Sequence, residues 1–170
     1  MKMPKSSAAI ILLSALCFLS FIDVTLSDKD RFFVDGRVYC DTCRIQIVTR
    51  ISTFLEGAKV RLECREEEGG NVTLSREAET DNNGKYRIEV EGDREEEICE
   101  VSLVKSSEEE CSEIPSDGFA HRARVSITAN NGITSPVRQA NPLGFMRKES
   151  DPGCKEVVRQ LGYDEAGLLV

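Results

Sequence analysis

Apolar and polar residues alternate along most of the chain beyond its first thirty positions. One segment places apolar residues at every second position, with charged residues between them: Ala58, Val60, Leu62 and Cys64. Successive side chains of a β-strand point to opposite faces, so this segment is predicted to be a strand with one buried face. The same period recurs in four further segments, 34–40, 85–90, 99–103 and 122–127.

Turn-forming residues separate these segments. Asp-Asn-Asn-Gly at 81–84 and Asn-Asn-Gly at 130–132 each lie between two strand-like segments. Asn-Gly tolerates the positive φ angles of tight hairpins, so both are predicted to be hairpin turns. Several short strands at this spacing predict an all-β fold, a small antiparallel β-barrel or sandwich.

One short helix is predicted near the C-terminus. Four apolar residues recur there at helical spacing: Cys154, Val157, Val158 and Leu161. Asp151 is a candidate N-cap, Pro152 suits the first turn, and Gly162 is placed to end the helix. The stripe would give the helix one apolar face.

The first 27 residues have the organisation of a signal peptide. Lys2 and Lys5 precede an apolar run over residues 8–21, and small residues follow it up to Ser27. The run is short for a membrane span, which disfavours the alternative of an uncleaved anchor. We therefore expect residues 1–27 to be a signal peptide, residues 28–170 to be one β-domain without a membrane span, and the protein to be secreted to the extracellular space.

The excess of acidic over basic residues affects which partners the chain can bind. Removing residues 1–27, which hold two lysines and one aspartate, takes the formal charge from −8 to −9. Such a charge disfavours binding to nucleic acid or to anionic lipid. Three acidic runs, 66–68, 95–97 and 108–110, lack metal-ligand spacing and are interpreted as solvated loops.

The cysteine count predicts disulfides. Cleavage would remove Cys17 and leave six cysteines: Cys40, Cys43, Cys64, Cys99, Cys111 and Cys154. An even number in a secreted chain indicates a disulfide framework, although Cys40-x-x-Cys43 alone could also suggest a redox motif or half a zinc site. Six cysteines allow 15 pairings. Cys64 and Cys99 both have the phase of buried strand residues, so a bridge between them across the core is natural, with other partners left open.

Candidate catalytic and modification residues are few. Outside the signal peptide the chain has a single histidine, His121, without a nucleophile-elbow, HExxH or P-loop motif. We expect no catalytic residue, no metal and no cofactor. Asn71-Val72-Thr73 is an N-glycosylation sequon after Gly69-Gly70, so Asn71 is expected to carry a glycan.

A longer stretch resembles a known family. Gly-Arg-Val-Tyr-Cys-Asp-Thr-Cys-Arg at 36–44 resembles the signature of the pollen Ole e I (olive-pollen major allergen) family. The resemblance continues over about residues 30–162, through Gly57-Ala58, Arg61-Leu62-Glu63-Cys64, Asn71-Val72-Thr73, Gly84-Lys85-Tyr86, Cys99-Glu100, residues 111–115, residues 141–145 and Cys154. The acidic residues at 95–97 and 108–110 depart from it.

The resemblance implies a fold, a pairing and a role. Carried over by order, it implies the disulfides Cys40–Cys111, Cys43–Cys154 and Cys64–Cys99. Family members are secreted plant glycoproteins with a compact β-barrel or sandwich. They are abundant in pollen, though also found outside it, are often allergens, and have no accepted enzymatic activity. Proposed roles are in pollen hydration, germination and tube growth, including as ligands of receptor kinases.

Three functions remain to be distinguished. The first is an extracellular interaction protein whose partner is another protein, such as a receptor-kinase ectodomain, or a cell-wall component. An acidic surface would be attracted to basic partners, and salt would weaken that attraction. The second is a structural, wall-associated protein without a discrete receptor. The third is an enzyme acting on wall polysaccharide, for which the missing motifs provide no support.

Overall fold

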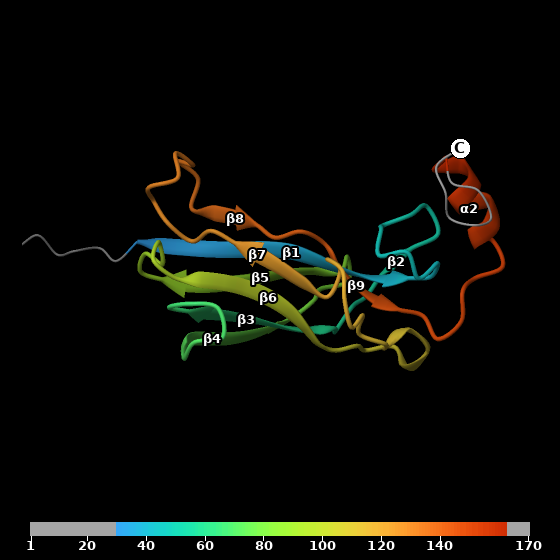
Figure 1. Cartoon of the computed structure of the whole chain (residues 1–170), viewed down its shortest axis with the longest axis horizontal. Coiled ribbons are helices and arrows are strands. Elements are labelled where there is room, and N and C mark those ends of the chain that lie inside the picture. Colours follow the sequence, from blue (N-terminus) through green and yellow to red (C-terminus); the bar gives the residue numbers. More distant parts are fainter. Residues whose placement is uncertain (1–29, 163–170) are drawn as a thin grey trace, which may run out of the picture.

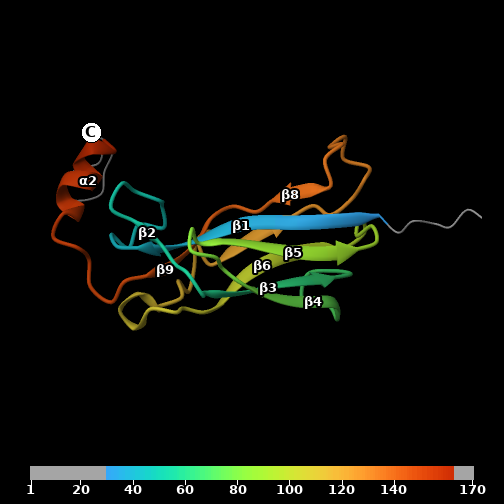
Figure 2. The ribbon, with the colours of Figure 1, turned by 180° about the vertical axis from the view of Figure 1, so that it is seen from behind.

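Two β-sheets pack face to face in residues 30–162, the part of the chain that the computed structural model describes (Figure 1). The predicted signal peptide, residues 1–27, lies outside these residues. Nine strands, a short 3₁₀ helix and one α-helix make up the described part. The helix lies beyond one end of the sheets, far from the start of the first strand, in both views (Figures 1 and 2).

The first sheet is built around one long strand, β1 (Arg31–Asp41). The first part of β1 pairs antiparallel with β5 (Lys85–Glu91) and parallel with β8 (Val137–Gln139). Its last part pairs antiparallel with β2 (Thr53–Phe54) and parallel with β9 (Leu143–Met146). A single strand therefore organises this whole sheet.

The pairing of β1 is interrupted between β8 and β9. The last residue of β8 lies opposite Asp35, and the first residue of β9 lies opposite Val38. The N–H of Ala140 still donates to the carbonyl of Asp35 at 2.8 Å. Gly36 and Arg37 therefore have no residue of β8 or β9 opposite them.

The second sheet is antiparallel throughout, in the order β4, β3, β6, β7. Its strands are β3 (Lys59–Arg65), β4 (Val72–Glu79), β6 (Ile98–Lys105) and β7 (Arg122–Val125). The edge strand β4 is largely exposed, whereas β3 and β6 bury every second residue. The 3₁₀ helix η1 (Glu109–Cys111) follows β6.

Apolar side chains from both sheets meet in one core. Val34 of β1, Leu62 of β3 and Val101 of β6 are each fully buried. The alternation in the sequence places these residues on the inner faces and their charged neighbours outside, which is the pattern of a two-sheet sandwich. The all-β fold with three disulfides and a C-terminal helix is thus confirmed. Of the two architectures predicted together, the structure has the sandwich.

Both Asn-Gly turns were predicted to close hairpins, and that prediction is wrong. Residues 81–84 do form a tight turn, in which the N–H of Gly84 donates to the carbonyl of Asp81 at 2.9 Å. However, the turn joins β4 of the second sheet to β5 of the first. Residues 130–132 likewise connect β7 to β8, which belong to different sheets. Turn chemistry specifies a local reversal of the chain, but it does not specify which sheet the next strand joins.

The predicted C-terminal helix is α2 (Cys154–Gln160), but its start differs from the prediction. Gly153 occupies the N-cap position, and Asp151 instead accepts the N–H of Gly153 at 2.8 Å in the preceding turn. Gly162 has a φ of 84°, as a helix-ending glycine requires. Cys154 and Val157 of α2 form a small second cluster with Cys43, packed by the partly buried Ile45 and Ile51. We call residues 43–51 and 151–162 the C-terminal annex.

Within residues 30–162, no helix has the length and apolar character that crossing a membrane requires.

Candidate functional site

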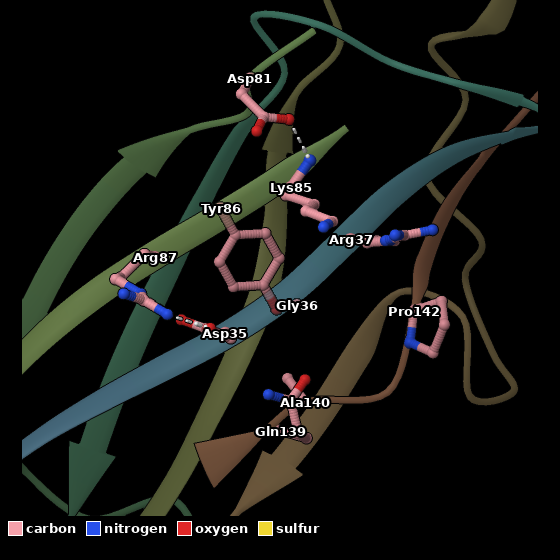
Figure 3. A pocket seen from close by; sticks show the side chains of 10 residues that line it. All are labelled: Asp35, Gly36, Arg37, Asp81, Lys85, Tyr86, Arg87, Gln139, Ala140 and Pro142. Atoms are coloured by element: carbon pink, nitrogen blue, oxygen red, sulfur yellow. Dashed lines mark hydrogen bonds and ion pairs between the residues drawn. The ribbon is translucent and has the colours of Figure 1, made fainter. Parts of the chain in front are cut away.

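A groove of about 770 Å³ opens on the first sheet, beside the interruption in the pairing of β1 (Figure 3). Three segments line it: residues 35–37 of β1, residues 85–87 of β5 with Asp81, and the β8–β9 connection. Its volume lies within the roughly 300–1,000 Å³ of small-molecule sites. Most of the side chains in it are charged or polar, so it suits a polar ligand.

Two cations stand opposite each other in the groove. Arg37 and Lys85 are register partners on adjacent antiparallel strands, both are exposed, and Figure 3 shows their side chains beside each other. Neither forms an ion pair with any residue in the described range. The guanidinium of Arg37 lies over the Phe54 ring, 5.0 Å from its centroid. Like charges in directly opposed positions destabilise a sheet, but Asp81 lies close enough for the charges of both cations to lower its pKa, and its carboxylate offsets part of this repulsion.

Two carboxylates in the groove are already engaged. Asp35 receives two hydrogen bonds from the Arg87 guanidinium, at 2.7 and 2.6 Å. Asp81 accepts the backbone N–H groups of Lys85 and Asn83, each at 2.8 Å. These bonds, first that of Lys85, lower the pKa of Asp81. Asp35 is thus engaged in an ion pair, and Asp81 is engaged in a turn while its charge also interacts with those of Lys85 and Arg37.

Tyr86 lies beneath the groove, on the core face of β5 between the exposed Lys85 and Arg87. Its ring crosses Gly36, and a Cβ atom at position 36 would lie only 2.2 Å from the Tyr86 hydroxyl, so only glycine can stand there (Figure 3). Tyr86 is 3% exposed, and its hydroxyl has no hydrogen-bond partner among the described residues. Burial, and secondarily the charge of Asp35, raises the pKa of Tyr86 far above its usual range. The hydroxyl therefore keeps its proton and can donate a hydrogen bond.

Three disulfides join the segments that surround the core. They are Cys40–Cys111, Cys43–Cys154 and Cys64–Cys99, the pairs that the family resemblance implies. Cys40–Cys111 connects β1 to η1, and Cys43–Cys154 connects the segment after β1 to α2. Cys64 and Cys99 are register partners on β3 and β6. Their bridge therefore lies within one sheet, instead of crossing the core between the two sheets.

Hydrogen bonds to a buried carboxylate fix the backbone that follows Cys40, around the second disulfide-bonded cysteine, Cys43. Asp41 is fully buried, and its carboxylate accepts the N–H of Cys43 at 3.2 Å and that of Gln46 at 2.6 Å. Arg44 and Gln46 both have positive φ, 58° and 59°, a conformation that non-glycine residues adopt only where surrounding contacts impose it. The buried carboxylate supplies those contacts, so the Asp-Thr-Cys-Arg part of the signature has a structural role.

Arg44 extends this network to a distant segment. Its guanidinium donates to both carboxylate oxygens of Glu113, at 2.7 and 2.8 Å, and to the carbonyl of Arg147 at 2.6 Å. The hydrogen bond from Arg44 lowers the pKa of Glu113. Sequence reasoning missed this pair because the partners lie 69 positions apart.

Asn71, the predicted glycosylation site, is exposed immediately before β4. The hydroxyl of Thr73 lies 3.0 Å from the carbonyl of Cys64 and 2.7 Å from a carboxylate oxygen of Glu97. The acidic run 95–97 therefore lies beside the sequon. The position is accessible for modification, and occupancy by a glycan remains a prediction.

Two other candidate centres have a structural explanation. Cys64, Glu97 and Cys99 place their ligand atoms within 4.8 Å of one another, but both sulfurs belong to a disulfide and offer no thiolate to a metal. The buried Nδ1 of His121 has no hydrogen-bond partner in the described part of the chain. Its ring is thus not oriented by a carboxylate there, as the histidine of a catalytic triad would be.

Comparisons with known proteins agree over most of the chain. A family model described as pollen protein Ole e 1 like matches residues 30–162. The Olee1-like protein of Betula pendula is 54% identical over 165 residues, which cover 96% of this chain and 99% of that protein. The anther-specific protein LAT52 of Solanum lycopersicum is 49% identical over 154 residues, covering 91% and 94% of the two chains.

A solved structure shares the fold. The crystal structure of the major plantain pollen allergen Pla l 1 superposes with a TM-score of 0.65 at 38% sequence identity. The superposition covers 73% of this chain and 99% of that one.

Proposed function

This chain belongs to the family described as pollen protein Ole e 1 like, and from that premise we propose that it is a secreted, non-enzymatic pollen protein that binds an extracellular partner. The proposed role is in pollen hydration, germination or tube growth. Relatives named as pollen allergens and as an anther-specific protein support a place in pollen.

The observation that carries the proposal is a cross-linked scaffold with exposed acidic loops. Three disulfides hold the sandwich and its annex. The acidic run 66–68 is exposed in the β3–β4 connection, and run 95–97 lies beside the start of β4 through the Thr73–Glu97 contact. Loops on a rigid scaffold are where binding residues are commonly found. The unoriented His121 supports a non-enzymatic role.

The charge of these loops favours a basic partner. Candidates are a receptor-kinase ectodomain with a basic surface or a cationic component of the cell wall. Attraction between exposed charges is screened beyond about 8 Å at physiological ionic strength, so binding should weaken as salt is added.

The test is affinity capture from pollen or cell-wall extract with the disulfide-bonded protein, at low and high salt. A captured protein is then purified and titrated to determine whether its binding saturates. The charge-neutral variant E66Q/E67Q/E68Q should bind it more weakly. The variant E108Q/E109Q/E110Q removes the same number of charges at η1, where Glu109 and Glu110 pair with Lys148, and it serves as the control for the loss of net charge alone.

Each outcome bears on the proposal. Saturable, salt-sensitive binding that only the first variant weakens supports it. Retention by the wall that never saturates would instead favour a structural, wall-associated protein. Turnover of a wall polysaccharide that is lost on a carboxylate substitution would replace the proposal by an enzymatic function.

A further inference from the structure

We propose that Asn131 is a site of spontaneous deamidation, and that the fold directs this reaction to Asn131 while it protects Asn83. Both asparagines precede a glycine, and no other asparagine of the chain does. A glycine in that position has no side chain to hinder attack of its backbone nitrogen on the asparagine side chain. This modification goes beyond the proposed function and does not depend on it.

The reaction consumes water and releases ammonia, and it needs no oxidant or reductant. The Gly132 nitrogen loses its proton to solvent and attacks Cγ of Asn131, where a new C–N bond forms. The bond from Cγ to the side-chain nitrogen then breaks, and that nitrogen takes up a proton and leaves as ammonia. Water opens the resulting cyclic imide at either carbonyl. The product is aspartate or isoaspartate, in which the main chain runs through the former side-chain carbonyl.

The tip of the β7–β8 connection leaves Gly132 free to react. Residues 129–136 are all exposed. The N–H of Gly132 forms no hydrogen bond with any residue in the range 30–162, and a Cβ atom there would meet nothing within 4 Å. Solvent can therefore remove the proton from this nitrogen, and no packed neighbour restrains the backbone as it moves.

The side chain of Asn131 is already held in a favourable position. The N–H of Ile133 donates to Oδ1 of Asn131 at 3.1 Å. This hydrogen bond folds the side chain back along the stretch of backbone that contains the Gly132 nitrogen. Oδ1 also gains negative charge as the nitrogen attacks Cγ, and a donor already aimed at that oxygen stabilises the charge. The loop therefore favours the attack as well as permitting it.

The Asn83–Gly84 pair has the opposite environment. The N–H of Gly84 donates to the carbonyl of Asp81 at 2.9 Å, and its own carbonyl accepts the N–H of Val38 at 2.8 Å. Gly84 is buried, and a Cβ atom there would lie 2.6 Å from the Val38 carbonyl oxygen. The nitrogen can attack only after this turn opens, so the reaction at Asn83 is limited to locally unfolded molecules.

The fold should survive the modification, because the base of the loop is fixed separately from its tip. The guanidinium of Arg138, which is 3% exposed, donates to the carbonyl of Thr128 at 2.5 Å and to that of Ser135. The hydroxyl of Thr128 in turn donates to Asp93 at 2.9 Å. The exposed tip between these anchors can absorb the extra backbone methylene of isoaspartate.

The reaction would make the surface more acidic as the protein ages. Asn130, the neighbour of Asn131, donates through its side-chain amide to Glu95. A carboxylate at position 131 would thus add negative charge near the acidic run 95–97. Anion-exchange chromatography should separate aged molecules from newly made ones.

The experiment is a prolonged incubation of the disulfide-bonded protein in mildly alkaline buffer, followed by mass spectrometry of its peptides. Replacement of an amide by a carboxylate raises the mass of the peptide that contains it. In the folded protein, the reaction at Asn131 should be at least about tenfold faster than that at Asn83. The reduced and denatured chain is the reference, in which both asparagines should react at comparable rates.

Matched variants identify the reacting side chain. N131Q should abolish most of the mass gain in the folded protein, because glutamine would have to close a larger ring, whereas N83Q should leave it unchanged. D81A removes the carboxylate that accepts the N–H of Asn83 at 2.8 Å, so it should speed the reaction at Asn83 several-fold and leave that at Asn131 unaffected. A denaturation curve for each variant establishes that it is folded.

Several results would overturn this assignment. They are equal rates at Asn83 and Asn131 in the folded protein, an unreacted Asn131 after the denatured chain has reacted, or a product that contains aspartate without isoaspartate. A mixture of isoaspartate and aspartate confined to position 131 supports it, since only the cyclic imide yields both.

Discussion

The sandwich and the C-terminal annex both contain a disulfide and buried apolar side chains, but they are stabilised differently. The sandwich core draws fully buried residues from both sheets, among them Val60, Leu62 and Phe145. The annex cluster holds only Cys43, Cys154 and Val157, packed by two half-buried isoleucines. Its helix, α2, has seven residues, too few to be stable alone. In the annex, a covalent bond therefore substitutes for apolar burial.

Hydrogen bonds to the end of β1 are the second means of attachment. The N–H of Asp151 donates to the carbonyl of Thr42 at 2.9 Å. The N–H of Arg147 donates to the backbone carbonyl of Asp41 at 3.1 Å. These contacts orient the segment leading to α2 without burying much apolar surface. We therefore expect the annex to open locally while the sandwich stays folded.

The largest expected effect comes from removing one disulfide from each region. In the chain-entropy model, the 111-residue separation of Cys43–Cys154 is worth about 5 kcal/mol and the 35 residues of Cys64–Cys99 about 4 kcal/mol. We expect the opposite order for the stability lost when each disulfide is removed. C64A/C99A should lower the free energy of unfolding by about 4 kcal/mol, since the native sheets stay ordered, and C43A/C154A by about 2 kcal/mol, since the freed annex regains entropy in the native state.

Urea denaturation of the two double variants measures this order, and hydrogen exchange locates the change. In C43A/C154A the amides of α2 should lose protection while those of β3 and β6 keep it. If C43A/C154A were the less stable variant, loop length alone would account for the disulfides, and the comparison of regions would be wrong.

Matched valine substitutions give the next largest effect. Val60 of β3 is fully buried and Val157 of α2 is 3% exposed, so V60A and V157A remove the same atoms from similar burial. V60A should cost about 2 kcal/mol of unfolding free energy through lost transfer energy and a cavity. V157A should change the global value by less than about 0.5 kcal/mol. Equal losses in denaturation curves would mean that both regions unfold as one unit.

Acid should loosen the annex before the sandwich. Arg44 lowers the pKa of Glu113, so the ionised carboxylate stabilises the folded form above the ordinary glutamate pKa of about 4.3. That contribution is lost as pH falls through the lower folded-state value. Protection factors of the annex amides should fall a few-fold in this window. In E113Q they should start lower and lack this step, and an identical pH dependence in both proteins would exclude the Arg44–Glu113 pair as its cause.

The smallest effect is expected at the exposed edge of the sandwich. N71Q should remove the mass of one glycan from protein made in plant cells, and an unshifted mass would mean that the sequon is unused. Because Asn71 is exposed and lies before β4, the polypeptide's free energy of unfolding should change by less than about 0.5 kcal/mol. A larger loss in unglycosylated protein would show that the edge contributes more to the sandwich than its burial indicates.

The strands that were predicted and those that were missed differ in burial. Strands β3, β5 and β6 bury one face, so alternation reveals them. Strand β9 buries three consecutive residues, Leu143 to Phe145, and β2 and β8 have only two and three residues. β9 buries consecutive residues, and β2 and β8 are too short to show an alternation, so none of them has a period-two pattern. Their pairing to β1 joins residues that are far apart in sequence, and no local pattern indicates it.

The candidate groove could not be predicted for the same reason. Arg37 and Lys85 lie 48 positions apart in sequence and become neighbours only through the register of β1 with β5. The requirement for Gly36 likewise depends on Tyr86 crossing it. Periodicity assigned Tyr86 to a buried face correctly, but it could not indicate that its hydroxyl would be left without a partner.

The central position of β1 has a consequence for synthesis. This strand is translated first among the described elements, yet its parallel partners come more than a hundred residues later, as in Phe33 with Val137 and Val38 with Leu143. At about 5–20 residues per second, one edge of β1 waits roughly 5–20 s after its own translation before those partners exist. An unpaired edge can recruit other chains during that delay. The nascent polypeptide would therefore benefit from a chaperone that shields its first strand until the ribosome has released nearly the whole sequence.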